Sequence, residues 1–185
     1  DIEGRAIWSK DAAGVISFMQ YDPLTGAMIK MIADVDTTET GDYDTGTLPY
    51  GWTGAGEHLI STFDHDLLGR TTVSVDPLGQ TSYTVYNDAD NEVRTYAGWN
   101  TDTDAPTAPI SVSRDDQEHG YSESLTMVTT PGLDGDVPDG SEAIAGILSL
   151  SRSYRNAAGQ TIYTDTYFDL TGVTYSHDAD IGGEL

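Results

Sequence analysis

A short acidic turn recurs eight times along this chain and constrains its fold more than any other feature. Each copy opens on Asp or Asn, continues through two or three variable residues and usually ends on Gly. An Asp or Asn side chain can accept hydrogen bonds from the amides that follow it, and Gly adopts positive φ at little steric cost. We therefore expect structural turns at Gly4, Gly14, Gly26, Gly69, Gly79, Gly159 and Gly172.

The segments between the turns have the composition of β-strands. Residues 71–75, 81–86 and 161–168 are rich in Thr, Val, Tyr and other residues that favour strands. Gly69 and Gly79 are 10 residues apart, and this spacing leaves room for a strand of roughly 5–7 residues. The pattern predicts an all-β fold of repeated antiparallel β-hairpins forming a curved sheet, in which each hairpin buries its apolar face against its neighbours.

Differences in composition divide the chain into five segments. In chain order these are a repeat block at 1–36, a Gly/Thr/Asp-rich spacer loop at 37–57, a second repeat block at 58–97, a Pro/Asp-rich insertion at 98–146, and a third repeat block with an acidic tail at 147–185. We expect the insertion to decorate the sheet, with short strands near 110–113 and 124–129.

Charge and composition exclude several classes of protein. The 185 residues include no cysteine, so disulfide-stapled modules and thiolate metal sites are excluded. Thirty-one acidic residues against eight basic ones give a formal net charge of −23, which repels phosphate backbones and anionic lipid. We therefore expect no nucleic-acid partner. No 18-residue apolar run occurs, so we also expect no membrane insertion within this segment.

With its tyrosines and spacing, the chain resembles the YD-repeat (Rhs-repeat) family, whose motif is Tyr-Asp-x-x-Gly-Arg followed by a strand. The nearest copies are Tyr21-Asp-Pro-Leu-Thr-Gly26, His65-Asp-Leu-Leu-Gly-Arg70, Val75-Asp-Pro-Leu-Gly-Gln80 and Tyr86-Asn-Asp-Ala-Asp-Asn91. The resemblance covers about 100 of the 185 residues. It departs from the motif where His65 and Val75 replace Tyr, and where Asp90 replaces Gly.

This resemblance implies a fragment of a longer bacterial protein, secreted or at the cell surface. Its hairpins would form a segment of a β-shell that encloses or presents other domains, such as a toxin, or the barrel of an adhesion protein. The expected partners are flanking repeats of the same polypeptide. The family's self-cleavage segment is associated with Asp-Pro-x-Gly-Leu, and Asp76–Gln80 departs from it at the last position. No cleavage residue is therefore carried over.

The residues indicate a structural protein and no enzyme. The four histidines have no metal-ligand spacing, and no Gly-x-Ser-x-Gly elbow occurs. Two alternatives stay open: a carbohydrate-binding or adhesion module, and a polysaccharide hydrolase with a pair of carboxylates in a cleft. Neither alternative singles out a catalytic residue.

Two acidic loops and three aromatic residues are the candidate binding sites. Asp residues at alternate positions can supply the oxygens that Ca²⁺ needs, so structural calcium is the cofactor hypothesis at Asp102, Asp104, Asp134, Asp136 and Asp139. Exposed aromatic rings in the spacer loop and in the insertion can stack on sugars. The carbohydrate hypothesis therefore rests on Tyr50, Trp52 and Trp99. Another cell-surface protein is an alternative partner for the same loops.

Overall fold

The computed structural model describes residues 1–128, 137–167, 170 and 174–177. Within these residues every strand pairing is antiparallel, and the helical structure is a single 3-10 turn, η1 (Thr45–Thr47). The predicted all-β antiparallel fold is confirmed. The chain divides into two compact units, Asp1–Gln80 and Thr81–Leu185.

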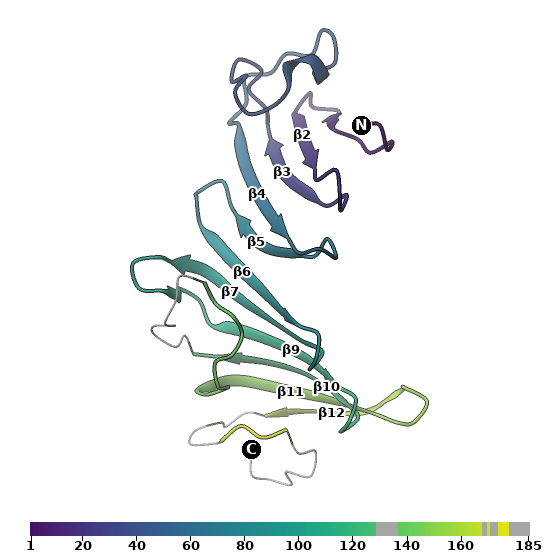
Figure 1. Ribbon diagram of the computed structural model, residues 1–185, viewed down its shortest axis with the longest axis vertical. Helices are drawn as coiled ribbons and strands as arrows, with labels where there is room; N and C mark the ends of the chain where they lie inside the picture. The colour runs from purple at the N-terminus through teal and green to yellow at the C-terminus, as the bar shows by residue number, and fades with distance from the viewer. Residues whose placement is uncertain (129–136, 168–169, 171–173, 178–185) are drawn as a thin grey trace. The chain divides into compact units, whose positions relative to one another are not determined.

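The first unit is a meander in which strands that are consecutive in the chain lie side by side (Figure 1). Its strands are β1 (Trp8–Lys10), β2 (Ile16–Tyr21), β3 (Met28–Ala33), β4 (Leu59–His65) and β5 (Thr71–Val75). The buried residues are Ile16, Phe18, Ile32, Val35 and Tyr43. Tyr43 comes from the predicted spacer loop, which therefore closes the core of this unit as well as connecting β3 to β4.

The recurring acidic turn has the geometry that its residues favour. Oδ1 of Asp66 accepts hydrogen bonds from the amides of Leu68 and Arg70, each at 2.9 Å. The carbonyl oxygen of Asp66 accepts from the amide of Gly69 at 3.0 Å, and Gly69 has φ of 78°. Positive φ also occurs at Gly4, Gly14, Gly26, Gly79 and Gly159. Gly172 lies outside the described residues.

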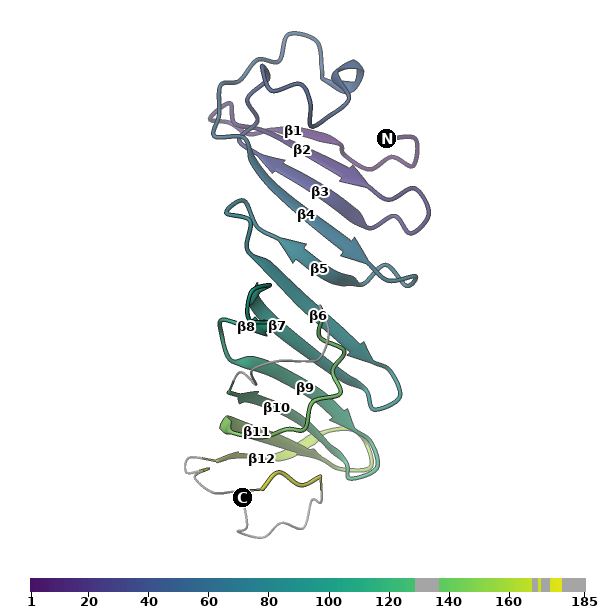
Figure 2. The same ribbon diagram turned by 60° about the vertical axis from the view of Figure 1, so that its left-hand side comes forward.

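The second unit contains the longest of the described strands. They are β6 (Thr81–Asn87), β7 (Glu92–Asn100), β8 (Ala105–Pro106), β9 (Ile110–Asp116), β10 (Tyr121–Met127), β11 (Ile147–Arg155) and β12 (Thr161–Tyr167). They pair in the order β6-β7-β9-β10-β11-β12, and β8 pairs with the end of β7 (Figure 2). The core consists of Tyr96, Trp99, Ile110, Val112, Leu125, Met127 and Leu150.

The segment 98–146 differs from its expected role as an insertion that decorates the sheet. Two full strands from this segment, β9 and β10, lie between β7 and β11 within the sheet. The physical reason is their alternation, because the even-numbered residues of β9 and the odd-numbered residues of β10 are mostly buried while Ser and Thr occupy most of the other positions. Of the described prolines in this segment, Pro109 and Pro138 lie outside the strands, and Pro106 ends the two-residue strand β8, away from the central strands.

Candidate functional site

A row of alternating acidic and basic residues crosses the sheet of the second unit. Glu92 on β7 is in register with Arg114 on β9, and Arg114 is in register with Glu123 on β10. Glu123 is in turn opposite Arg152 on β11. All four residues are buried, and Arg152 is 0% exposed. We call these four residues the charged row.

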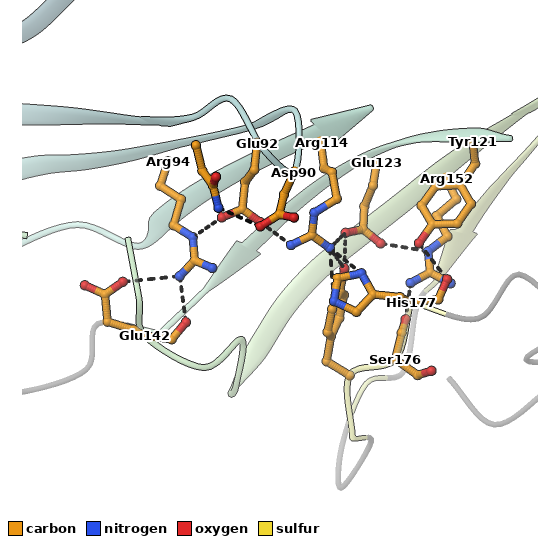
Figure 3. Close-up of polar contacts among 12 residues, drawn as sticks. Asp90, Glu92, Arg94, Arg114, Tyr121, Glu123, Glu142, Arg152, Ser176 and His177 are labelled. Atoms are coloured by element: carbon orange, nitrogen blue, oxygen red, sulfur yellow. Dashed lines mark hydrogen bonds and ion pairs between the residues drawn. The ribbon is translucent and has the colours of Figure 1, made fainter. Parts of the chain in front are cut away.

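Direct ion pairs join the members of the charged row (Figure 3). Arg152 Nε lies 2.7 Å from Oε2 of Glu123, and Nη2 of Arg114 contacts Oε2 of Glu92. Arg114 Nη1 also lies 3.8 Å from Oε1 of Glu123. Arg94, two positions along β7 from Glu92, donates from Nε to Oε1 of Glu92 at 2.5 Å. Each glutamate is therefore shared between two arginines.

Two segments from elsewhere in this unit complete the contacts of the row. The Tyr175 hydroxyl donates to Oε1 of Glu123 and accepts from Nη1 of Arg114, both at 2.5 Å. The carbonyl oxygen of Ser176 accepts from Nη2 of Arg152, also at 2.5 Å. Side chains of the charged row, those of Arg114, Glu123 and Arg152, thus hold residues 174–177 across it.

The second covering segment contacts Arg94, the partner of Glu92, through Glu142. Its carbonyl oxygen accepts from Nη1 of Arg94 at 2.7 Å, and its Oε2 accepts from the hydroxyl of Tyr96 at the same distance. Together with the charged row, Arg94 and Glu142 make a network of three guanidinium groups and three carboxylates. The formal charges of this buried network cancel.

The pKa values in this network favour charged arginines and neutral tyrosines. Burial alone would lower the pKa of Arg152, but the hydrogen bond and the negative charge of Glu123 outweigh burial and raise this pKa. Burial, followed by the hydrogen bond to Glu142, raises the pKa of Tyr96. Burial and then Glu123 raise the pKa of Tyr175 in the same way. General acid–base catalysis needs a group that titrates near neutral pH. The raised pKa values of Arg152, Tyr96 and Tyr175 are far above that range.

A groove of about 620 Å³ adjoins the network. Glu92, Arg94 and Arg114 line it together with acidic residues from the end of β9 and from the turn that follows, including Asp116 and Glu118. Its carboxylates outnumber its arginines, and the arginines that reach it are already paired with Glu92. The groove therefore offers no unpaired guanidinium to an anionic ligand.

The three described calcium candidates, Asp102, Asp104 and Asp139, do not form a cluster of metal ligands. Asp102 and Asp104 lie in the turn after β7, where Asp104 has φ of 46°. Asp139 accepts from the amide of Ser141 at 2.8 Å, and hydrogen bonds from Ser141 lower its pKa. The remaining two candidates, Asp134 and Asp136, lie outside the described residues. Among the residues that are described, no group of three His, Asp or Glu side chains converges as metal ligands do.

The three aromatic candidates for sugar binding have different surroundings. Trp99 is 6% exposed and belongs to the core of the second unit, so its ring is covered. Trp52 packs against the core of the first unit, with Lys10 Nζ 5.7 Å from its ring centroid. Tyr50 is fully exposed. Of the three, only Tyr50 presents a ring that is largely accessible to a sugar.

Sequence reasoning missed the charged row, although a signal for it exists. Each member is in phase with the buried apolar residues of its own strand, as Arg114 is with Val112 and Arg152 is with Leu150. Charged residues seldom occupy such positions unless they are paired. The pattern to search for is an acidic residue on one predicted strand and a basic residue on a neighbouring one, both at inward-facing positions.

The fold and this network define the chain as an all-β antiparallel protein with a buried ionic row in its second unit. A scan against protein-family models and a search of curated proteins both find no match to the chain. Within the described residues, no helix is both long enough and apolar enough to cross a membrane.

Proposed function

We propose that this chain is a non-enzymatic structural segment of a secreted or cell-surface protein of the YD-repeat kind. In this proposal its hairpins contribute wall to a larger β-shell that encloses or presents other domains. Its partners would be flanking hairpins of the same polypeptide. The observation that carries the proposal is the charged row, whose buried charges are used to join neighbouring strands.

The distribution of positive charge supports a structural role. All six arginines of the chain form ion pairs with acidic side chains. Of the two lysines, Lys30 lies 3.6 Å from Oδ1 of Asp42, and Lys10 lies over the ring of Trp52. The basic residues are thus engaged within the chain, whereas recognition of an anionic substrate needs cationic groups that are free to meet it.

The mode of unfolding tests this proposal. In a sheet of hairpins, stability is a sum of local and nearest-neighbour contributions, so we expect stepwise thermal unfolding that begins at the terminal strands. Circular dichroism would follow the transition, and hydrogen exchange would locate it, with the amides of β1 and β12 exchanging before those of β9 and β10. One sharp transition with uniform protection in all strands would contradict the proposal, and turnover of a polysaccharide would favour the hydrolase alternative.

A carbohydrate-binding or adhesion module remains the second candidate, and the exposed ring of Tyr50 is the observation that favours it. Binding to a glycan array that is lost in Tyr50→Ala, with the fold retained, would support this candidate. Retention of binding in that variant would exclude the Tyr50 ring from recognition.

A further inference from the structure

The spacer loop of the first unit is closed at a neck, where residues 34–37 lie against residues 54–58. The amide of His58 donates to the carbonyl oxygen of Asp34 at 2.9 Å, and the amide of Glu57 donates to Oδ2 of Asp34 at 3.0 Å. These bonds hold the two ends of the loop together. One further bond at the neck depends on a side chain that can titrate.

His58 closes the neck through its ring. The amide of Asp36 donates to Nδ1 of His58 at 3.2 Å, so Nδ1 is the acceptor and the proton of the neutral ring is on Nε2. Nε2 is buried and has no hydrogen-bond partner within the described residues, but it lies 3.6 Å from Oδ2 of Asp42. The His58 side chain is 11% exposed, so water has little access to the ring.

A second proton on the ring would change what the neck can bind. Histidine side chains change charge between about pH 5 and pH 8. In the charged ring both nitrogens are donors, so Nδ1 can no longer accept from the Asp36 amide. The new charge also strengthens the attraction between Nε2 and the carboxylate of Asp42. Protonation therefore exchanges the hydrogen bond to Asp36 for an ion pair with Asp42.

The charged groups around His58 favour this exchange on balance. Two carboxylates of the loop and its neck, those of Asp36 and Asp42, interact electrostatically with the ring. Lys30 on β3 opposes them, since its Nζ lies 3.6 Å from Oδ1 of Asp42 and donates to the carbonyl oxygen of Asp42. Tyr43, whose ring centroid is 6.4 Å from that of His58, stays neutral because burial raises its pKa. Two acids thus face one lysine.

We propose that His58 is a pH-sensitive latch at the neck of the spacer loop, which holds the Asp36 amide when neutral and releases it to pair with Asp42 when protonated. Release weakens the closure of the loop that supplies Tyr43 to the core of the first unit and that carries the exposed Tyr50. Loss of one such hydrogen bond corresponds to about five- to tenfold more frequent opening of the amide. The latch does not depend on the proposed function, because it would operate whether or not the chain is part of a shell.

Hydrogen exchange measured by NMR on the full chain at about pH 7.5 and about pH 5 tests the latch. The rates are corrected for the intrinsic pH dependence of exchange. We expect protection of the Asp36 amide to fall about five- to tenfold toward the lower pH. The internal control is the amide of Val35, which donates to the carbonyl oxygen of Ile16 at 2.8 Å. Its protection should stay constant, because this bond does not involve His58.

Two variants separate the titration of His58 from other effects. In His58→Asn the side-chain oxygen can replace Nδ1 as the acceptor but does not titrate, and asparagine tolerates the φ of 51° at this position. The Asp36 amide should then be equally protected at both pH values. In Asp42→Asn the protonated ring loses its ion pair, so the fall in protection should move to lower pH.

Three results would overturn the proposal. One is constant protection of the Asp36 amide in the unmodified chain across this pH range. Another is the same fall in folded His58→Asn, which would assign the effect to a carboxyl group. The third is an equal fall at Val35, which would assign it to opening of the sheet. If His58→Asn does not fold, Asp42→Asn decides, and an unchanged midpoint of the fall in that variant overturns the proposal.

Discussion

Removal of Arg152 tests whether the charged row holds the second unit together. The side chains of Arg152 and Glu123 are 0% and 1% exposed and lie 2.7 Å apart. Arg152 also donates to the carbonyl oxygen of Ser176 and lies over the ring of Tyr121 at 4.6 Å. The variant Arg152→Leu leaves Glu123 buried with its closest guanidinium gone. Breaking a buried pair in this way costs about 3–5 kcal/mol.

The assay is urea unfolding with hydrogen exchange as the readout. Hydrogen exchange reports the second unit separately from the first. With a slope of about 2 kcal/mol per molar urea, a loss of about 4 kcal/mol lowers the midpoint by about 2 M. The double variant Glu123→Leu/Arg152→Leu buries no unpaired carboxylate at this position. We expect it to recover a large part of the loss, because a buried ion pair and a packed apolar pair often have similar stability.

Arg155 provides a matched control on the same strand. Its guanidinium pairs with Asp115 at 2.7 Å, but the two side chains are 37% and 42% exposed. Arg155→Leu should therefore cost about 1 kcal/mol or less. Equal losses for Arg152→Leu and Arg155→Leu, or a double variant as unstable as the sum of its single changes, would refute the reasoning about burial.

Three further outcomes are expected. Trp99→Ala should destabilise the second unit by about 3–5 kcal/mol, whereas Tyr50→Ala should change stability by less than about 0.5 kcal/mol; similar losses in urea unfolding would contradict these different burials. The pKa values of Asp22 and Asp66 are lowered, chiefly by backbone hydrogen bonds from Thr25 and Arg70, respectively. Below about pH 4 these carboxyl groups therefore bind protons more readily in the unfolded chain than in the folded chain. Stability should fall there as pH falls, and Asp66→Asn should flatten the decline measured by urea unfolding. The melting temperature should be the same in millimolar calcium and in chelator, and a clear rise with calcium would instead support the acidic-loop hypothesis.

The fold was predictable because its signals are local. The Asp-x-x-Gly turns need only a side-chain oxygen and a residue that tolerates positive φ, and both are visible in the sequence at Asp66 and Gly69. The predicted strands near 110–113 and 124–129 overlap β9 and β10, respectively. Their place within the sheet was not predictable from composition, because Pro and Asp in the connections obscured the alternation inside the strands.

The contacts of the charged row depend on register, which the sequence does not display. Glu123 and Arg152 are 29 residues apart, and only the pairing of β10 with β11 brings them together. The burial of Trp99 could not be predicted from the sequence either. Its position in a spacer suggested an exposed ring, but the length of β7 carries it into the core.

The two closest pairs of the charged row occur where the chain itself cannot fix the register. A tight turn joins β9 to β10, and the Arg114–Glu123 distance across that pair is the longest in the row, at 3.8 Å. Long connections join β7 to β9 and β10 to β11, and there the row makes its direct contacts. A slip by one residue is prevented because it would expose the apolar face, but a slip by two residues keeps every side chain on its own face. After such a slip between β10 and β11, Arg152 would lie opposite Tyr121 or Leu125, and Glu123 would lose its direct contact with Arg152. The buried charges therefore select one register at the two strand pairs that lack a turn to set it.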